Sequence, residues 1–125
     1  MILDTNALSA FVDGAPEVGA TLSAQRQAAI PVIVLSEFRY GIMGSRHRET
    51  YEEWLKTHLR HFDILPIAAE TTLPYATLRA TLKKSGRPIP ANDAWIAALA
   101  MQYGLPILSR DAHFDALREL RRIGW

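Results

Sequence analysis

Four acidic side chains stand at positions where a chain of alternating strands and helices commonly places its chemistry. Asp4 follows a short apolar run at 1–3, and Asp111 comes just after another at 107–108. Glu37 and Asp93 stand near the starts of two expected helices. Because the carboxyl ends of parallel strands meet at one edge of a sheet, where ligands of such sheets bind, we expect the four carboxylates to gather there.

A bare cluster of this kind is costly, because two like charges ~4 Å apart repel by about 4 kcal/mol at an effective dielectric constant near ~20. Protonation or a bound cation removes the repulsion. Hard oxygen ligands, without sulfur and without suitably spaced histidines, favour Mg²⁺ or Mn²⁺. A divalent ion can activate water and stabilise charge on a phosphoryl group, which is the chemistry of metal-dependent nucleases. Helix N-termini beneath Glu37 and Asp93 would favour their ionised forms.

Each acid also has an ordinary interpretation. Glu37 and Asp93 could simply complement the dipoles of their helices, and Asp111 could be a turn residue after a strand. Asp4, directly after three apolar residues, is the hardest of the four to explain in this way. Convergence of all four at one edge therefore favours a common role.

The pattern of the chain predicts the elements that position these acids. Apolar runs indicate strands at 1–3, 28–34, 64–67 and 107–108, with an edge strand at 122–125. The first strand is expected at the centre of the sheet. Helices are expected at 7–12, 16–26, 37–44, 51–62, 70–84 and 91–103, with a helical turn at 113–117. This alternation predicts one domain over residues 1–125, a three-layer α/β/α fold around a mainly parallel sheet of four to five strands.

Composition narrows the functional class. The chain is 49% hydrophobic and 22% charged, as folded globular domains are, and its lack of cysteine excludes disulfides and a thiol nucleophile. No signal peptide and no apolar run of ~18 residues is present, so we expect a cytoplasmic protein without a membrane span. The chain has 14 basic and 13 acidic residues, and without the four acids singled out above 9 acidic residues remain. The rest of the protein then has a net charge of +5, which could attract a polyanion.

Four stretches, in order and spacing, resemble PIN-domain proteins, specifically the VapC-type toxin ribonucleases of bacterial type II toxin–antitoxin pairs. They are LDTN at 3–6, LSEFRYGI at 35–42, NDAWIAA at 92–98 and LSRDAHF at 108–114. The resemblance implies a Mg²⁺-dependent endoribonuclease, with Mn²⁺ able to substitute. It also implies homodimers and a heteromeric complex with a cognate antitoxin, which inserts a segment, often through an Arg, into the acidic groove. The implied acidic site is Asp4, Glu37, Asp93 and Asp111, supported by Thr5, Asn6 and Ser109.

Several features are interpreted more modestly. The strand before Asp4 is short for the family, which leaves open a start upstream of Met1. Asp115 is interpreted as a solvated turn acid rather than an auxiliary ligand, and His113 as a packing residue rather than a general acid. The stripe at 51–62 is expected to be core rather than a partner face. Basic sets at 46–48, 83–87 and 118–122 could contact RNA or be ordinary surface.

The resulting hypothesis is hydrolysis of RNA by a metal-activated water. Asp4, Asp93 and Asp111 would be the main ligands, and Glu37 would bind a second ion directly or through water. One alternative is a PIN nuclease that acts in RNA processing or turnover outside a toxin–antitoxin pair. Another is a non-catalytic metal-binding or interaction module, which predicts a missing acid.

Overall fold

Five parallel strands form the central sheet of the computed structural model, which describes all residues from Met1 to Trp125. The sheet order is β3-β2-β1-β4-β5, so β1 (Ile2–Leu3) is the central strand, as predicted. Ile2 lies opposite both Ala29 and Ile107, and its side chain is fully buried because helices cover both faces. The strands are β1, β2 (Ala29–Pro31), β3 (Asp63–Leu65), β4 (Ile107–Leu108) and β5 (Arg122–Ile123).

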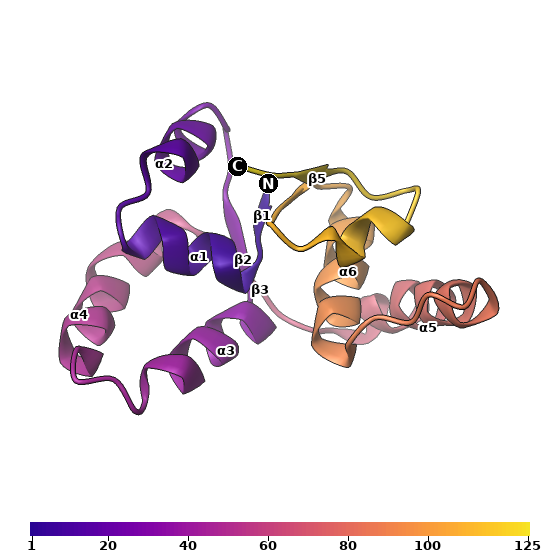
Figure 1. Cartoon of the computed structure of the whole chain (residues 1–125), viewed down its shortest axis with the longest axis horizontal. Helices are drawn as coiled ribbons and strands as arrows, with labels where there is room; N and C mark the ends of the chain where they lie inside the picture. The colour runs from indigo at the N-terminus through magenta and orange to yellow at the C-terminus, as the bar shows by residue number, and fades with distance from the viewer.

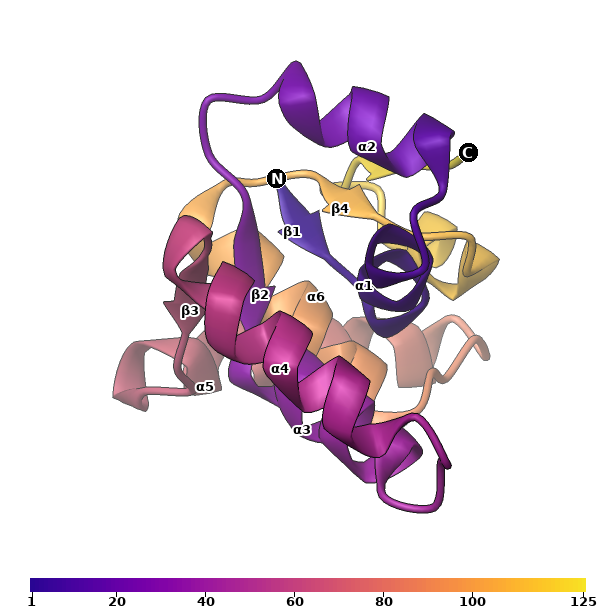
Figure 2. The ribbon, with the colours of Figure 1, turned by 90° about the vertical axis from the view of Figure 1, so that its left-hand side faces the viewer.

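Helices lie on both sides of this sheet, which confirms the predicted α/β fold (Figure 1). On one side are α1 (Thr5–Val12), α2 (Pro16–Ser23) and α4 (Arg48–His58), which face the viewer in Figure 2. On the other are α5 (Ala69–Lys84) and α6 (Ala91–Tyr103), which pack against each other. Helix α3 (Val32–Ile42) contacts α1, α4 and α6, and therefore joins the two layers near the carboxyl edge of the strands.

The boundary between β2 and α3 differs from the prediction. The apolar run at 28–34 was expected to be one strand, with a helix capped by Ser36 and opened by Glu37; in the structure the strand ends at Pro31 and α3 begins at Val32. Val34, Phe38 and Ile42 recur at helical spacing and are buried, so packing makes the run helical. Glu37 consequently lies in the second turn of α3, too far from its N-terminus for the expected dipole effect.

Helix α6 begins and ends where it was predicted, at Ala91 and Tyr103. Pro90 occupies the cap position before Ala91, and Asp93 lies in the first turn. Gly104 ends the helix in the left-handed conformation, at φ 65°, where a side chain would be strained. The apolar side chains of α6 are buried nearly all round, which anchors its first turn against the sheet.

The aromatic stripe belongs to the core, as expected. The predicted helix over 51–62 ends earlier, at His58, and continues as a 3₁₀ turn, η1 (Leu59–His61). Trp54 and Phe62 pack edge-on against Phe11, with ring centroids 5.8 and 6.0 Å apart.

The helices are all too short, or too polar, to span a bilayer.

Candidate metal centre

Asp4 is the most constrained acid of the molecule. It directly follows the central strand, is only 4% exposed, and caps α1 through a hydrogen bond from the backbone N–H of Thr5 to its Oδ1 at 2.8 Å. Its Oδ2 accepts hydrogen bonds from Ser109 Oγ at 2.6 Å and from Asn6 Nδ2 at 3.2 Å. The carboxylate is therefore held in one orientation by three donors.

Ser109 connects Asp4 to the loop that carries Asp111. Its side chain is fully buried at the end of β4, beside the central strand. While its hydroxyl donates to Asp4, its Oγ accepts hydrogen bonds from the backbone N–H of Asp111 at 2.9 Å and from Asn6 at 3.3 Å. Asn6 Oδ1 in turn accepts from the backbone N–H of Arg110 at 3.2 Å. This network sets the distance between the two acid-bearing segments.

Asp93 and Asp111 meet across the ring of His113. Asp111 accepts a hydrogen bond from the backbone N–H of His113 at 2.9 Å and so opens the 3₁₀ turn η2 (Ala112–Ala116). His113 Nδ1 then lies 3.1 Å from Asp111 Oδ1 and 3.4 Å from Asp93 Oδ2. One potential ligand atom from each of the three residues lies within 4.8 Å of the others.

The packing interpretation of His113 is wrong. Its side chain is 53% exposed and faces the two acids, whereas the neighbouring Phe114 is fully buried and packs the turn onto the domain. The cause is the tight 3₁₀ turn, in which Asp111 caps the backbone of the residue two positions later. The short spacing between Asp111 and His113 was the sequence signal for this arrangement.

Glu37 joins the group through Thr5. The hydroxyl of Thr5 donates to Glu37 Oε1 at 3.2 Å, and the backbone of the same residue binds Asp4. Contacts between α1 and α3 bring these residues together. The structure thus groups Asp93 and Asp111 with His113, brings Asp4 near enough for its charge to act on both acids, and places Glu37 beside Thr5. The metal-binding roles of the four acids stay predictions.

The electrostatics of the cluster are those of acids that lack a counter-charge. Burial, and secondarily the charge of Asp111, raise the pKa of Asp4, although hydrogen bonds from Ser109, Thr5 and Asn6 oppose this. Burial also raises the pKa of Asp93, reinforced by the charges of Asp4 and Asp111 and opposed by His113. Of the basic side chains, His113 alone comes within 4.0 Å of any of the four acids. Carboxylate oxygens with one imidazole nitrogen form a donor set that fits Mg²⁺ and, better, Mn²⁺.

Asp115 lies outside the cluster, in agreement with its interpretation as a turn acid. Arg122 of β5 binds it with two hydrogen bonds, from Nε at 2.9 Å and from Nη2 at 2.8 Å. This pairing lowers the pKa of Asp115 and raises the pKa of Arg122. Its carboxylate is already satisfied by a permanent cation and is a poor ligand for a second one.

We expect Ser109→Ala to lower the free energy of unfolding by about 1–3 kcal/mol, because it leaves the Asp111 N–H without its acceptor and Asp4 without its shortest donor. Metal affinity should fall about 10–100-fold, the usual effect of losing a group that orients a ligand. Urea unfolding and calorimetric titration with Mn²⁺ measure the two effects. Ser109→Thr, which keeps the hydroxyl, is the matched control, and equal behaviour of the two variants would contradict this role.

Comparison with known proteins gives consistent matches over nearly the whole chain. The sequence profile of the PIN domain matches residues 1–120. Ribonuclease VapC5 of Mycobacterium tuberculosis is 31% identical over 118 residues, which cover 93% of this chain and 86% of that protein. Ribonuclease VapC1 of Haemophilus influenzae strain R2866 is 26% identical over 129 residues, covering 99% and 96%.

Solved structures show the same similarity in three dimensions. VapBC2 of Rickettsia felis, crystallised with a DNA fragment from its promoter, matches with a TM-score of 0.90 at 26% identity, covering 99% of this chain and 97% of that one. FitAcB of Neisseria gonorrhoeae matches with a TM-score of 0.85 at 27% identity, covering 98% and 95%. Similarity therefore extends over the sheet, the helices and the segments that carry the four acids.

Proposed function

This chain belongs to the PIN-domain family, among the VapC-type ribonuclease toxins, and from that premise we propose that it hydrolyses RNA phosphodiester bonds with Mg²⁺ or Mn²⁺ at its acidic cluster. The observation that carries the proposal is the meeting of Asp93 and Asp111 at His113, close enough to Asp4 for the charges to repel, with no lysine or arginine within 4.0 Å of the three acids. Such a site is suited to divalent cations and, through them, to phosphates.

The chain's own residues hold and orient the reacting groups. When bound, the metal would activate a water molecule and neutralise charge on the phosphoryl oxygens. Asp4, Asp93 and Asp111 would hold it, and Ser109 and Asn6 keep the Asp4 carboxylate from rotating away. Such fixed ligands favour catalysis because little reorganisation is needed during the reaction.

Glu37 and His113 would complete the site from opposite sides. Glu37 is oriented by the Thr5 hydroxyl and would bind a second ion, directly or through water. His113 presents Nδ1 to both Asp93 and Asp111. A proton on this nitrogen would hold the two carboxylates together, and the unprotonated nitrogen would be a further ligand.

A cognate antitoxin is the expected protein partner. Several of the similar structures are toxin–antitoxin complexes, among them VapBC-1 from nontypeable Haemophilus influenzae. We propose that the antitoxin inserts an Arg among the bare carboxylates and so competes with the metal. A homodimer, which the family resemblance implies, would bury exposed apolar side chains such as Tyr40 on α3 and Leu73 on α5.

The direct test is cleavage of single-stranded RNA by the purified protein. We expect cutting with Mn²⁺ or Mg²⁺, none after chelation by EDTA, and recovery on return of the metal. Asp93→Asn should lose activity, whereas Glu119→Gln, an exposed acid outside the cluster, should retain it. Undiminished cleavage by Asp93→Asn, or in EDTA, would refute the proposed site.

A further inference from the structure

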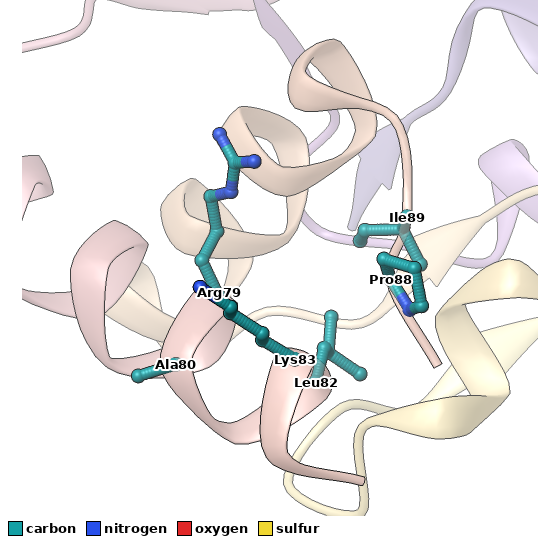
Figure 3. A pocket seen from close by; sticks show the side chains of 6 residues that line it. All are labelled: Arg79, Ala80, Leu82, Lys83, Pro88 and Ile89. Carbon is teal, nitrogen blue, oxygen red and sulfur yellow. The ribbon is translucent and has the colours of Figure 1, made fainter. Parts of the chain in front are cut away.

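Two hollows lie side by side between the acidic cluster and α5. The first, about 250 Å³, is lined by His113 and Arg87, together with Pro88 and Ile89. The second, about 440 Å³, has Pro88 and Ile89 on one side and Arg79 and Lys83 of α5 on the other (Figure 3). Because Pro88 and Ile89 line both, the two hollows are neighbours, and together we call them the α5 groove; it begins at His113, which contacts Asp93 and Asp111.

The charge of the α5 groove is positive and unpaired. Arg79, Lys83 and Arg87 are exposed, and no carboxylate lies within 4.0 Å of any of them. Asp115 is the only acid in the lining, and Arg122 already binds it with two hydrogen bonds. The groove therefore offers three positively charged side chains without a carboxylate partner to a ligand. The acidic cluster next to it has the opposite charge.

One of these cations is held in position before any ligand arrives. Arg79 Nη1 donates to the hydroxyl of Tyr75 at 2.8 Å, and its guanidinium lies 5.6 Å from the centre of that ring. Tyr75 stacks on Trp95 of α6, with ring centroids 3.6 Å apart. Since α6 also carries Asp93, the stack connects the groove to the metal centre and reduces the entropy that Arg79 would lose on binding.

We propose that the α5 groove binds the RNA strand on one side of the phosphate that is cleaved, an inference that rests on the proposed function. A phosphate held through a cation bound by Asp93 and Asp111 would have its neighbours along the RNA at or beyond His113, where the groove begins. Arg87, Lys83 and Arg79 would contact successive phosphates, and exposed Pro88 and half-buried Ile89 would contact ribose. Phosphate contacts of this kind give binding that does not depend on sequence.

The test measures RNA binding in a background that does not cut. Asp4→Asn is the parent, and its charge-removed derivative adds Arg79→Gln, Lys83→Gln and Arg87→Gln. The matched control adds Arg26→Gln, Arg60→Gln and Arg121→Gln instead. These three exposed residues precede β2, β3 and β5 and so lie near the opposite edge of the sheet. Fluorescence anisotropy with a labelled single-stranded RNA of about 12 nucleotides reports affinity.

We expect the groove derivative to bind RNA at least about tenfold more weakly than the parent at low salt, and the control to bind like the parent. Its plot of log affinity against log salt should be shallower by about 2, because each phosphate contact in a single strand contributes about 0.7. Equal binding by the groove derivative and the parent would overturn the inference while leaving the proposed function intact. No RNA binding by the parent would overturn the inference, and absence of RNA cleavage by the protein with Asp4 intact would overturn the proposed function as well.

A second arm separates RNA from anions in general. If a polyglutamate peptide of equal charge binds the parent as tightly as RNA, and the groove substitutions weaken both equally, the assignment to RNA is overturned.

Cleavage kinetics give an independent readout in the protein with Asp4 intact. The three groove substitutions should raise KM for the longer RNA with little change in kcat, since they remove uniform binding. For a dinucleotide, which has a single phosphodiester, the rise in KM should be smaller; an equal rise for both substrates would contradict the groove's role along the strand.

Discussion

Asp4→Asn should reduce RNA cleavage by about 10³-fold or more without unfolding the protein. A catalytic metal supplies several kcal/mol of transition-state stabilisation, and each ~1.36 kcal/mol is a factor of ten in rate. Asp4 accepts hydrogen bonds from three donors, on Thr5, Ser109 and Asn6. An amide keeps one accepting oxygen for them but turns an NH2 towards the rest, at a local cost of about 1–3 kcal/mol. The substitution therefore removes the charge at a cost that a folded domain can tolerate.

The stability of the Asp4→Asn variant distinguishes the loss of a metal ligand from the loss of folded structure. Burial raises the pKa of Asp4, so its ionised form costs stability in the metal-free protein, and removal of that charge should offset part of the lost hydrogen bonding and leave Asp4→Asn folded near pH 7.5. Cleavage assays, thermal unfolding and Mn²⁺ titration on the same samples are the required measurements, with Glu119→Gln as the control. Full cleavage by Asp4→Asn would refute its role as a ligand, and loss of cleavage with Mn²⁺ binding unchanged would leave its role outside the metal site.

Metal binding should stabilise the protein, and the stabilisation should grow with pH. Asp4 and Asp93 both have a raised pKa in the folded state, so the folded protein holds more protons than the unfolded chain above the ordinary carboxyl range, near pH ~4. The contribution of Asp4 and Asp93 to the stability of the metal-free protein is therefore fully present below that range. It is lost as pH rises through their raised pKa values. A cation replaces those protons and restores stability where the carboxylates are ionised.

Thermal unfolding in EDTA and in excess Mn²⁺, at pH 5 and at pH 7.5, checks both parts of this prediction. At a metal concentration about 100 times its Kd, the stabilisation should be about 2.7 kcal/mol. The metal-induced rise in Tm should be larger at pH 7.5 than at pH 5. A variant with Asp4→Asn and Asp93→Asn should show a flatter pH dependence and little response to metal. A rise in Tm of equal size in this variant would place the ion elsewhere.

Local sequence was sufficient for much of this molecule. The apolar surface of α6 and its end at Gly104 follow from residue type, because buried helices are apolar all round and a left-handed cap favours glycine. Alternation of apolar runs with helical periods predicted the α/β fold, the central place of β1 and the edge that carries the acids. The motif around Asp4 and the order of the four stretches also indicated the PIN-domain family.

Other features depend on contacts between distant segments. The run at 28–34 was predicted as one strand from its β-branched composition, which is wrong for residues 32–34; short runs of this kind occur in both strands and helices, and burial of Val34, Phe38 and Ile42 makes this part helical. The hydrogen bond from Ser109 to Asp4 exists because β4 pairs with β1, across nearly the whole chain.

The surroundings of the acids were decided by tertiary structure alone. His113 faces Asp93 because η2 is a tight turn packed next to α6, and Asp115 faces Arg122 because β5 returns beside β4. The α5 groove forms only when Pro88 and Ile89 lie between α5 and η2. The physical reason is common to all of these features: residue type and spacing determine local conformation and the edge of the sheet at which a side chain emerges, whereas its neighbours depend on how separate segments pack together.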